Sequence, residues 1–129
     1  MQDDQDTRIP SEDTLLRGVP PDQWSFEKNR PSTGALDTEE LCTDWTRFRD
    51  ADAFMDRHNR RALGHGLISF LAGMPRACGL IVRHDPNPAY EPDNEAHTLI
   101  VGTKKGSFTS SVKKPDKTTI IFPAQKLAD

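Results

Sequence analysis

The stretch that most constrains the fold runs from Gly79 to Gly102, because it contains two strand-like runs joined by a long polar connection. Residues 80–82 and 99–101 are apolar, rich in β-branched side chains and bounded by glycine, a pattern typical of strands. The connection, residues 85–95, carries three prolines and four acidic residues. It is too long for a tight hairpin turn, and its prolines hold it extended. We predict two antiparallel strands joined by this acidic arch.

Two histidines flank the arch. His84 ends the first predicted strand and His97 begins the second. If the strands pair antiparallel, the two imidazoles stand near each other at the mouth of the arch. This mouth, with Asp85 and Glu95 beside it, is the first candidate site in the chain.

Length and composition predict one domain with a modest core. The chain has 129 residues, 34% hydrophobic residues and a mean hydropathy of -0.71, which is low for a compact domain. We therefore predict a disordered acidic segment over residues 1–13, one domain over 14–123 and a frayed end over 124–129. No apolar run reaches the roughly 18 residues of a membrane span, and the acidic start lacks the features of a secretory signal.

The two cysteines, Cys42 and Cys78, lie far apart and have no metal-binding spacing. Reduced thiols and a cytoplasmic location are the expectation that follows. The net charge of -3 argues against a general nucleic-acid binder. Six lysines between residues 103 and 129 form either a basic patch or a solubilising surface that blunts an edge strand.

The remaining elements predict an α+β fold. Asp37 and Glu40 have the spacing of a capping box, and Leu41, Trp45 and Phe48 then repeat at helical spacing. A second helix is predicted over 51–61, starting at Asp50 or Asp52, and a short one over 73–78. Strands are predicted over 66–71, where a buried helix remains an alternative, and over 117–122, while residues 15–19 form a strand or a peripheral arm. The expected architecture is a small mixed sheet of three to five strands with two or three helices.

Short motifs also carry a resemblance. The loop at residues 30–36 reads Arg-Pro-Ser-Thr-Gly-Ala-Leu, Asp85-Pro86 opens the arch, and residues 94–97 read Asn-Glu-Ala-His. These resemble a set of small bacterial proteins of uncharacterised activity, with the motifs Arg-x-Ser-Ser-x-Ala-Phe and Asp-Pro-x-Pro-x-Asn-Pro-Ala-His-Ala. The chain departs from them at Thr33, Leu36, Glu95 and Thr98. The resemblance spans roughly residues 15–123, implies a bacterial cytosolic protein and transfers no catalytic role.

Catalytic motifs are sparse. Glycine-rich phosphate loops, a GxSxG elbow and HExxH are all missing from the sequence. A metal-independent ribonuclease toxin is one hypothesis, with His84 and His97 as acid and base and with Arg83, Lys104 and Lys105 neutralising the phosphate. The four carboxylates of the arch count against RNA binding. His84, Asp85, Glu95 and His97 offer metal-type donors, but their spacing is not a metal signature, so no metal or cofactor is predicted.

A binding module is the preferred hypothesis. A rigid proline-rich arch, an aromatic-bearing segment at residues 22–26 and a lysine-rich loop are features of recognition surfaces. We expect a non-catalytic accessory subunit of a bacterial multi-protein system whose partner is another protein, encoded nearby. The candidate binding residues are Arg30, Ser32, Asp85, Glu95, Lys104 and Lys105.

Overall fold

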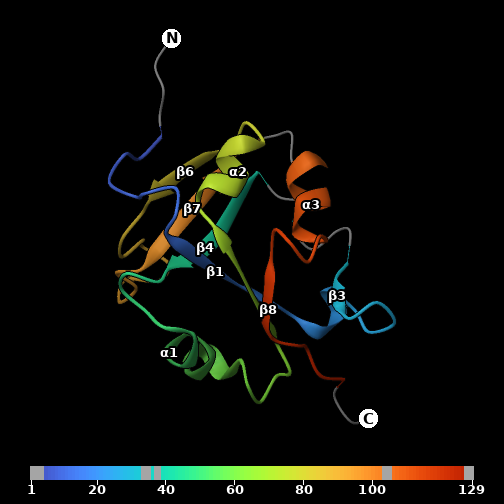
Figure 1. The fold of residues 1–129 in the computed structure, drawn as a ribbon. Helices are drawn as coiled ribbons and strands as arrows, with labels where there is room; N and C mark the ends of the chain where they lie inside the picture. The colour runs from blue at the N-terminus through green and yellow to red at the C-terminus, as the bar shows by residue number, and fades with distance from the viewer. Residues whose placement is uncertain (1–4, 33–35, 37–38, 103–105, 127–129) are drawn as a thin grey trace.

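A six-stranded antiparallel sheet forms the centre of the computed structural model, which describes residues 5–32, 36, 39–102 and 106–126 (Figure 1). The strand order is β6-β7-β4-β1-β5-β8, and each neighbouring pair is antiparallel. The strands are β1 (Thr14–Val19), β4 (Glu40–Trp45), β5 (Gly66–Leu71), β6 (Ile81–His84), β7 (His97–Val101) and β8 (Thr119–Phe122). A second sheet of two short strands pairs β2 (Trp24–Ser25) with β3 (Arg30–Pro31).

In the described part of the chain, three short α-helices flank the large sheet: α1 (Ala51–Asp56), α2 (Gly73–Ala77) and α3 (Gly106–Val112). The class is α+β, as predicted, but the expected mixed sheet of three to five strands was wrong: the described residues form eight strands, six of them in one fully antiparallel sheet. No helix in the described part of the chain is long and apolar enough to cross a membrane.

The main core lies on the face of the sheet that α2 and α3 cover, and the two helices lie next to each other in Figure 1. Phe70 of β5 and Phe108 of α3 meet edge to face there, with ring centroids 5.4 Å apart. A smaller cluster on the opposite face packs Phe54 and Met55 of α1 against Leu16 and Leu67. The molecule therefore has one large apolar layer and one small one, on opposite faces of the sheet.

The largest error in the predicted fold concerns residues 40–48, which form strand β4 instead of a helix. Leu41, Thr43 and Trp45 alternate into the core and are 0%, 3% and 3% exposed, whereas Phe48 lies outside the strand and is 39% exposed. Residues four positions apart, such as Leu41 and Trp45, lie on the same side of a helix because four residues make about one turn. They also lie on the same side of a strand, because every second residue of a strand faces the same way. Asp37 of the supposed capping box lies outside the described residues.

Residues 5–13 were predicted to be disordered, yet they pack against the body of the protein. Ile9 is 1% exposed, and Arg76 of α2 holds the segment by donating to the Asp6 and Ile9 carbonyls at 2.8 Å each. Arg76 also donates to Gln5 Oε1 at 2.9 Å and to Ser11 Oγ at 3.1 Å. An acidic, polar stretch is ordered here by hydrogen bonds to one arginine, which hydrophobic patterning does not register.

Candidate functional site

The two histidines at the mouth of the arch point to opposite faces of the sheet. β6 and β7 do pair antiparallel, and His84 lies opposite Thr98. Cross-strand partners share a face, and successive residues of a strand alternate, so His97 projects to the other face. The two imidazoles therefore project from opposite faces of the sheet and cannot contact the same substrate.

His97 is buried and forms hydrogen bonds that join it to the arch. It is 2% exposed, and its Nδ1 lies 3.1 Å from the Asp85 carbonyl and 3.2 Å from Asp85 Oδ2. Its Nε2 lies 3.1 Å from the hydroxyl of Tyr90, which in turn lies 3.7 Å from Cys42 Sγ. Burial of this hydroxyl raises the pKa of Tyr90, and the Cys42 thiol raises it further. The network fastens the arch to the sheet.

His84 has an equally structural environment on the other face. Its ring stacks on Phe48, with centroids 5.3 Å apart, and meets the edge of Trp45 at 5.2 Å. Its Nε2 lies 2.8 Å from the carbonyl of Glu95, the other acidic residue predicted at the site. Among the residues that the structure describes, no group of three or more His, Cys, Asp or Glu side chains is arranged to hold a metal ion.

Arg57 pairs with two of the four acidic residues of the arch. Arg57 donates to Glu91 Oε2 at 2.9 Å and to Asp93 Oδ1 at 3.2 Å, and His58 Nε2 lies 2.7 Å from the same Glu91 oxygen. Burial alone would raise the pKa of Glu91, but hydrogen bonds from His58, Arg57 and Asn94 outweigh it and lower this pKa to about 2. Nothing in the sequence predicted that Arg57 and His58 pair with the arch, because they lie 34 and 33 residues before Glu91 along the chain.

A basic groove of 410 Å³ lies beside β8, between β3 and the end of α3. Its cationic lining residues are Lys28, Arg30, Lys113 and Lys114, and no carboxylate is among the described residues that line it. Arg30 belonged to the predicted binding set. Ser32, from the same set, follows β3 and donates its backbone N–H to the Gln23 carbonyl at 2.9 Å. Lys104 and Lys105 lie outside the described residues.

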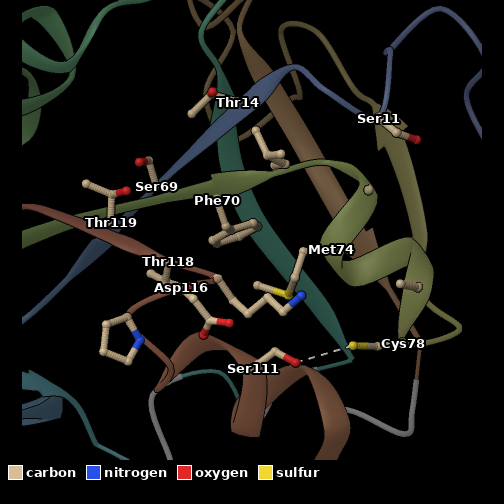
Figure 2. A pocket seen from close by; sticks show the side chains of 15 residues that line it. Ser11, Thr14, Ser69, Phe70, Met74, Cys78, Ser111, Asp116, Thr118 and Thr119 are labelled. Carbon is tan, nitrogen blue, oxygen red and sulfur yellow. Dashed lines mark hydrogen bonds between the residues drawn. The ribbon is translucent and has the colours of Figure 1, made fainter.

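A hydroxyl-lined pocket of 510 Å³ adjoins the other side of the same segment, between β5, α2, α3 and the start of β8 (Figure 2). Phe70, Met74 and Cys78 give it an apolar wall, while Ser69, Ser111 and Thr119 contribute hydroxyls. The Cys78 sulfur lies 3.9 Å from Ser111 Oγ, and no described histidine lines the pocket. Asp116 and Lys117 also line the pocket, but no hydrogen bond between described residues joins either of them to Cys78 or Ser111, so we interpret the pocket as suited to binding.

Thr118 connects the two cavities because it lines both of them. It is 7% exposed, and its Oγ1 is buried without a hydrogen-bond partner among the residues that the structure describes. A buried hydroxyl of this kind costs free energy until a partner satisfies it.

The outer strands of the large sheet differ sharply. The chain segment before β1 covers the free side of β6: Asp6 N–H donates to the Val82 carbonyl at 3.0 Å, and Val82 N–H donates to Gln5 Oε1 at 3.0 Å. His84 N–H donates to Asp6 Oδ2 at 3.1 Å. At the other end of the sheet β8 pairs only with β5, and no described segment pairs with its outer side. We call β6 the closed edge and β8 the open edge.

No family model, curated protein or solved structure matched the chain when it was compared with each of these sets. The bacterial resemblance of the short motifs therefore stays a prediction, and the functional argument rests on the geometry above.

Proposed function

We propose that the protein is a non-catalytic interaction protein that receives an extended acidic segment of a partner protein along the open edge. The observation that carries this proposal is the position of β8, an unpaired outer strand that borders the basic groove. An extended peptide can add to such an edge through main-chain hydrogen bonds, which supply affinity, while neighbouring pockets supply specificity.

The positive charge of the basic groove determines which kind of partner segment binds there. Lys28, Arg30, Lys113 and Lys114 surround the groove, so an acidic peptide gains favourable electrostatic energy there and a basic one is repelled. The net charge of -3 leaves this patch as a local exception on an acidic protein. We accordingly assign to the partner a strand-forming segment that carries aspartate or glutamate.

Apolar and polar contacts are available next to the edge. Ile120 on β8 is 37% exposed and Leu71 on β5 is 50% exposed, so both offer surface for a side chain of the partner. The hydroxyl-lined pocket, which Leu71 and Thr118 help to line, can receive a side chain of the incoming segment. A bacterial, cytoplasmic setting and a partner encoded nearby complete the proposal.

The ribonuclease alternative has no comparable support. A general acid and a general base must both reach the same phosphate, and His84 and His97 occupy opposite faces of the sheet. A direct assay separates the hypotheses: purified protein incubated with RNA and EDTA should leave the RNA intact. RNA cleavage that both His84→Ala and His97→Ala abolish would overturn the interaction proposal.

Site-specific photo-crosslinking in the native host tests the open edge. A benzoylphenylalanine at position 120 should crosslink to one dominant partner, whereas the same group at position 63 should not, although Leu63 is 46% exposed. The crosslinked partner peptide, identified by mass spectrometry, should be extended and acidic. Equal crosslinking at both positions, or a basic partner peptide, would contradict the proposal.

Charge reversal gives the matched binding test. The synthetic peptide identified by crosslinking should bind the wild-type protein, and Lys28→Glu combined with Lys114→Glu should weaken it by about tenfold or more. Arg47→Glu is the control, because Arg47 is also exposed but lies on the opposite part of the sheet, beside Trp45 and Phe48. An unchanged affinity in the double variant would remove the basic groove from the site.

A further inference from the structure

A second pocket, of 230 Å³, lies where the central strands β1 and β4 separate. The two strands pair only through Leu15 with Trp45 and Leu16 with Asp44. Beyond these pairs Arg17 bridges the gap, and its Nη1 donates to the Cys42 carbonyl at 3.0 Å. A guanidinium thus takes the place of a ladder hydrogen bond and becomes part of the pocket wall.

Arg60 forms the facing wall. Its guanidinium lies 3.7 Å from the centroid of the Phe54 ring, and its Nη1 donates to the Phe54 carbonyl at 2.7 Å. Gly18 makes this approach possible, because a Cβ at this position would stand 3.1 Å from Phe54 Cε1 and 3.5 Å from Arg60 Nε. The backbone of β1 therefore brings two arginines to one cavity.

Neither arginine forms an ion pair with a carboxylate of the described residues. The two acids that line the pocket have other partners: Asp44 accepts from Arg49 at 2.9 Å, and Glu91 accepts from Arg57 at 2.9 Å. The pocket consequently holds two cationic groups without a direct ion pair: burial lowers the pKa of Arg60, and the more distant charges of Asp44 and Glu91 offset this only in part. Charges removed from water without a counter-charge destabilise the folded state, and a bound anion relieves this cost.

Two histidines, His65 and His97, also line the pocket, and the ring of His97 already has partners in Asp85 and Tyr90. Burial lowers the pKa of His65, and the positive charge of Arg60 lowers it further, so the ring is neutral at pH 7 and can donate one hydrogen bond. The volume of 230 Å³ is below the roughly 300 Å³ at which pockets for drug-sized ligands begin, so the occupant is small.

We propose that this arginine pocket binds a phosphate group, with Arg17 and Arg60 supplying the charge and His65 one further donor. Two guanidiniums match a doubly charged tetrahedral oxyanion, because each can donate two parallel hydrogen bonds to its oxygens. The group is either free phosphate or the end of a small phosphate monoester. This site is separate from the open edge and does not depend on the proposed partner.

Titration of the full chain with inorganic phosphate at constant ionic strength tests the site. Phosphate should raise the melting temperature in a saturable manner and shift the side-chain Nε resonances of Arg17 and Arg60, but not that of exposed Arg8, in NMR spectra. A parallel titration with glycerol 3-phosphate distinguishes the two sources: tighter binding than phosphate identifies a monoester site, and weaker binding identifies a site for the free anion.

Arg60→Gln should weaken phosphate binding by about tenfold or more, and Arg60→Lys should lose less because it keeps the charge. Arg47→Gln, a change at an exposed arginine far from the pocket, should bind like the wild type. The wild-type resonances report on the site even if a variant fails to fold. No saturable shift of Arg17 and Arg60 at millimolar phosphate, or equal binding by Arg60→Gln, would overturn the proposal.

Discussion

The two outer strands of the sheet show how differently one protein can treat equivalent edges. At the closed edge, Gln5 and Asp6 use side-chain as well as backbone atoms to satisfy Leu80, Val82 and His84. At the open edge β8 offers an unpaired side and a partly exposed isoleucine beside a row of cationic residues. An unprotected edge strand invites pairing with other chains, and proteins usually blunt such edges. Protection of one edge and exposure of the other indicate that the exposed one has a use.

The strongest way to break this contrast is to release the segment that closes β6. Arg76→Met should destabilise the protein by about 3 kcal/mol, because it removes four hydrogen bonds and leaves the Asp6 and Ile9 carbonyls without their charged donor. Urea unfolding measures the change. Arg47→Met, at an exposed position, is the control and should change stability by less than about 0.5 kcal/mol. Equal effects of the two substitutions would show that residues 5–13 contribute little to closing the edge.

Acid should open the closed edge selectively. The hydrogen bond from Arg8 is the largest cause of a lowered Asp6 pKa, and backbone donors including His84 N–H add to it against the opposing effect of burial. The folded pKa lies below the unfolded value of 3.8, so this stabilisation is present above pH 4 and is lost as the pH falls through 3.8 and below. Between pH 5 and 3 we expect a loss of roughly 1 kcal/mol from this group, since Arg8 is exposed to solvent.

Hydrogen exchange at the His84 amide, followed by NMR over this pH range, reports the opening directly. Asp6→Asn should exchange faster at pH 6 and should show a flatter dependence of stability on pH than the wild type. Protonation of Glu91 also lowers the stability in acid, but this loss is the same in the wild type and in Asp6→Asn. If the free energy of unfolding of Asp6→Asn fell with pH as steeply as that of the wild type, the role assigned to Asp6 would be contradicted.

The smallest effect is expected at the open edge. Ile120→Lys should change the free energy of unfolding by less than about 0.5 kcal/mol, because the side chain is 37% exposed and packs weakly. The same substitution should abolish binding of the synthetic partner peptide, since a charge on the edge prevents strand addition. Urea unfolding and the peptide-binding assay provide the two measurements. A large loss of stability would mean that Ile120 belongs to the core and does not form part of a binding surface.

The sequence predicted the hairpin of β6 and β7 because both strands combine β-branched residues with bounding glycines. It also predicted strands at β5, with a helix as the alternative, and at β8, and it left the start of α1 open between Asp50 and Asp52. The structure selects Asp50, whose side chain accepts a hydrogen bond from Ala53 N–H at 2.8 Å. It failed at residues 40–45, where the spacing of two large residues fitted both periods. Strand β1, considered a possible peripheral arm, is central because its neighbours β4 and β5 come from distant parts of the chain.

The candidate site was harder to predict than the fold. The sequence patterns predicted that β6 pairs with β7, but they did not determine the register. In the structure His84 lies opposite Thr98 and not opposite His97, so the two histidines face opposite sides of the sheet. The arginine pocket depends on contacts between β1, β4 and the segment around residue 60, none of which leaves a local motif. The lack of a side chain at Gly18, where Arg60 packs, was the only local hint.

Closure of β6 by residues 5 and 6 also bears on the order of folding. Gln5 and Leu80 are separated by 75 residues, and Asp6 and His84 by 78. On a ribosome, the covering segment emerges long before the strand that it protects. Contacts of such high sequence separation form slowly, so newly made chains pass through a stage in which both outer strands are bare. Chaperone dependence during synthesis is the expected consequence.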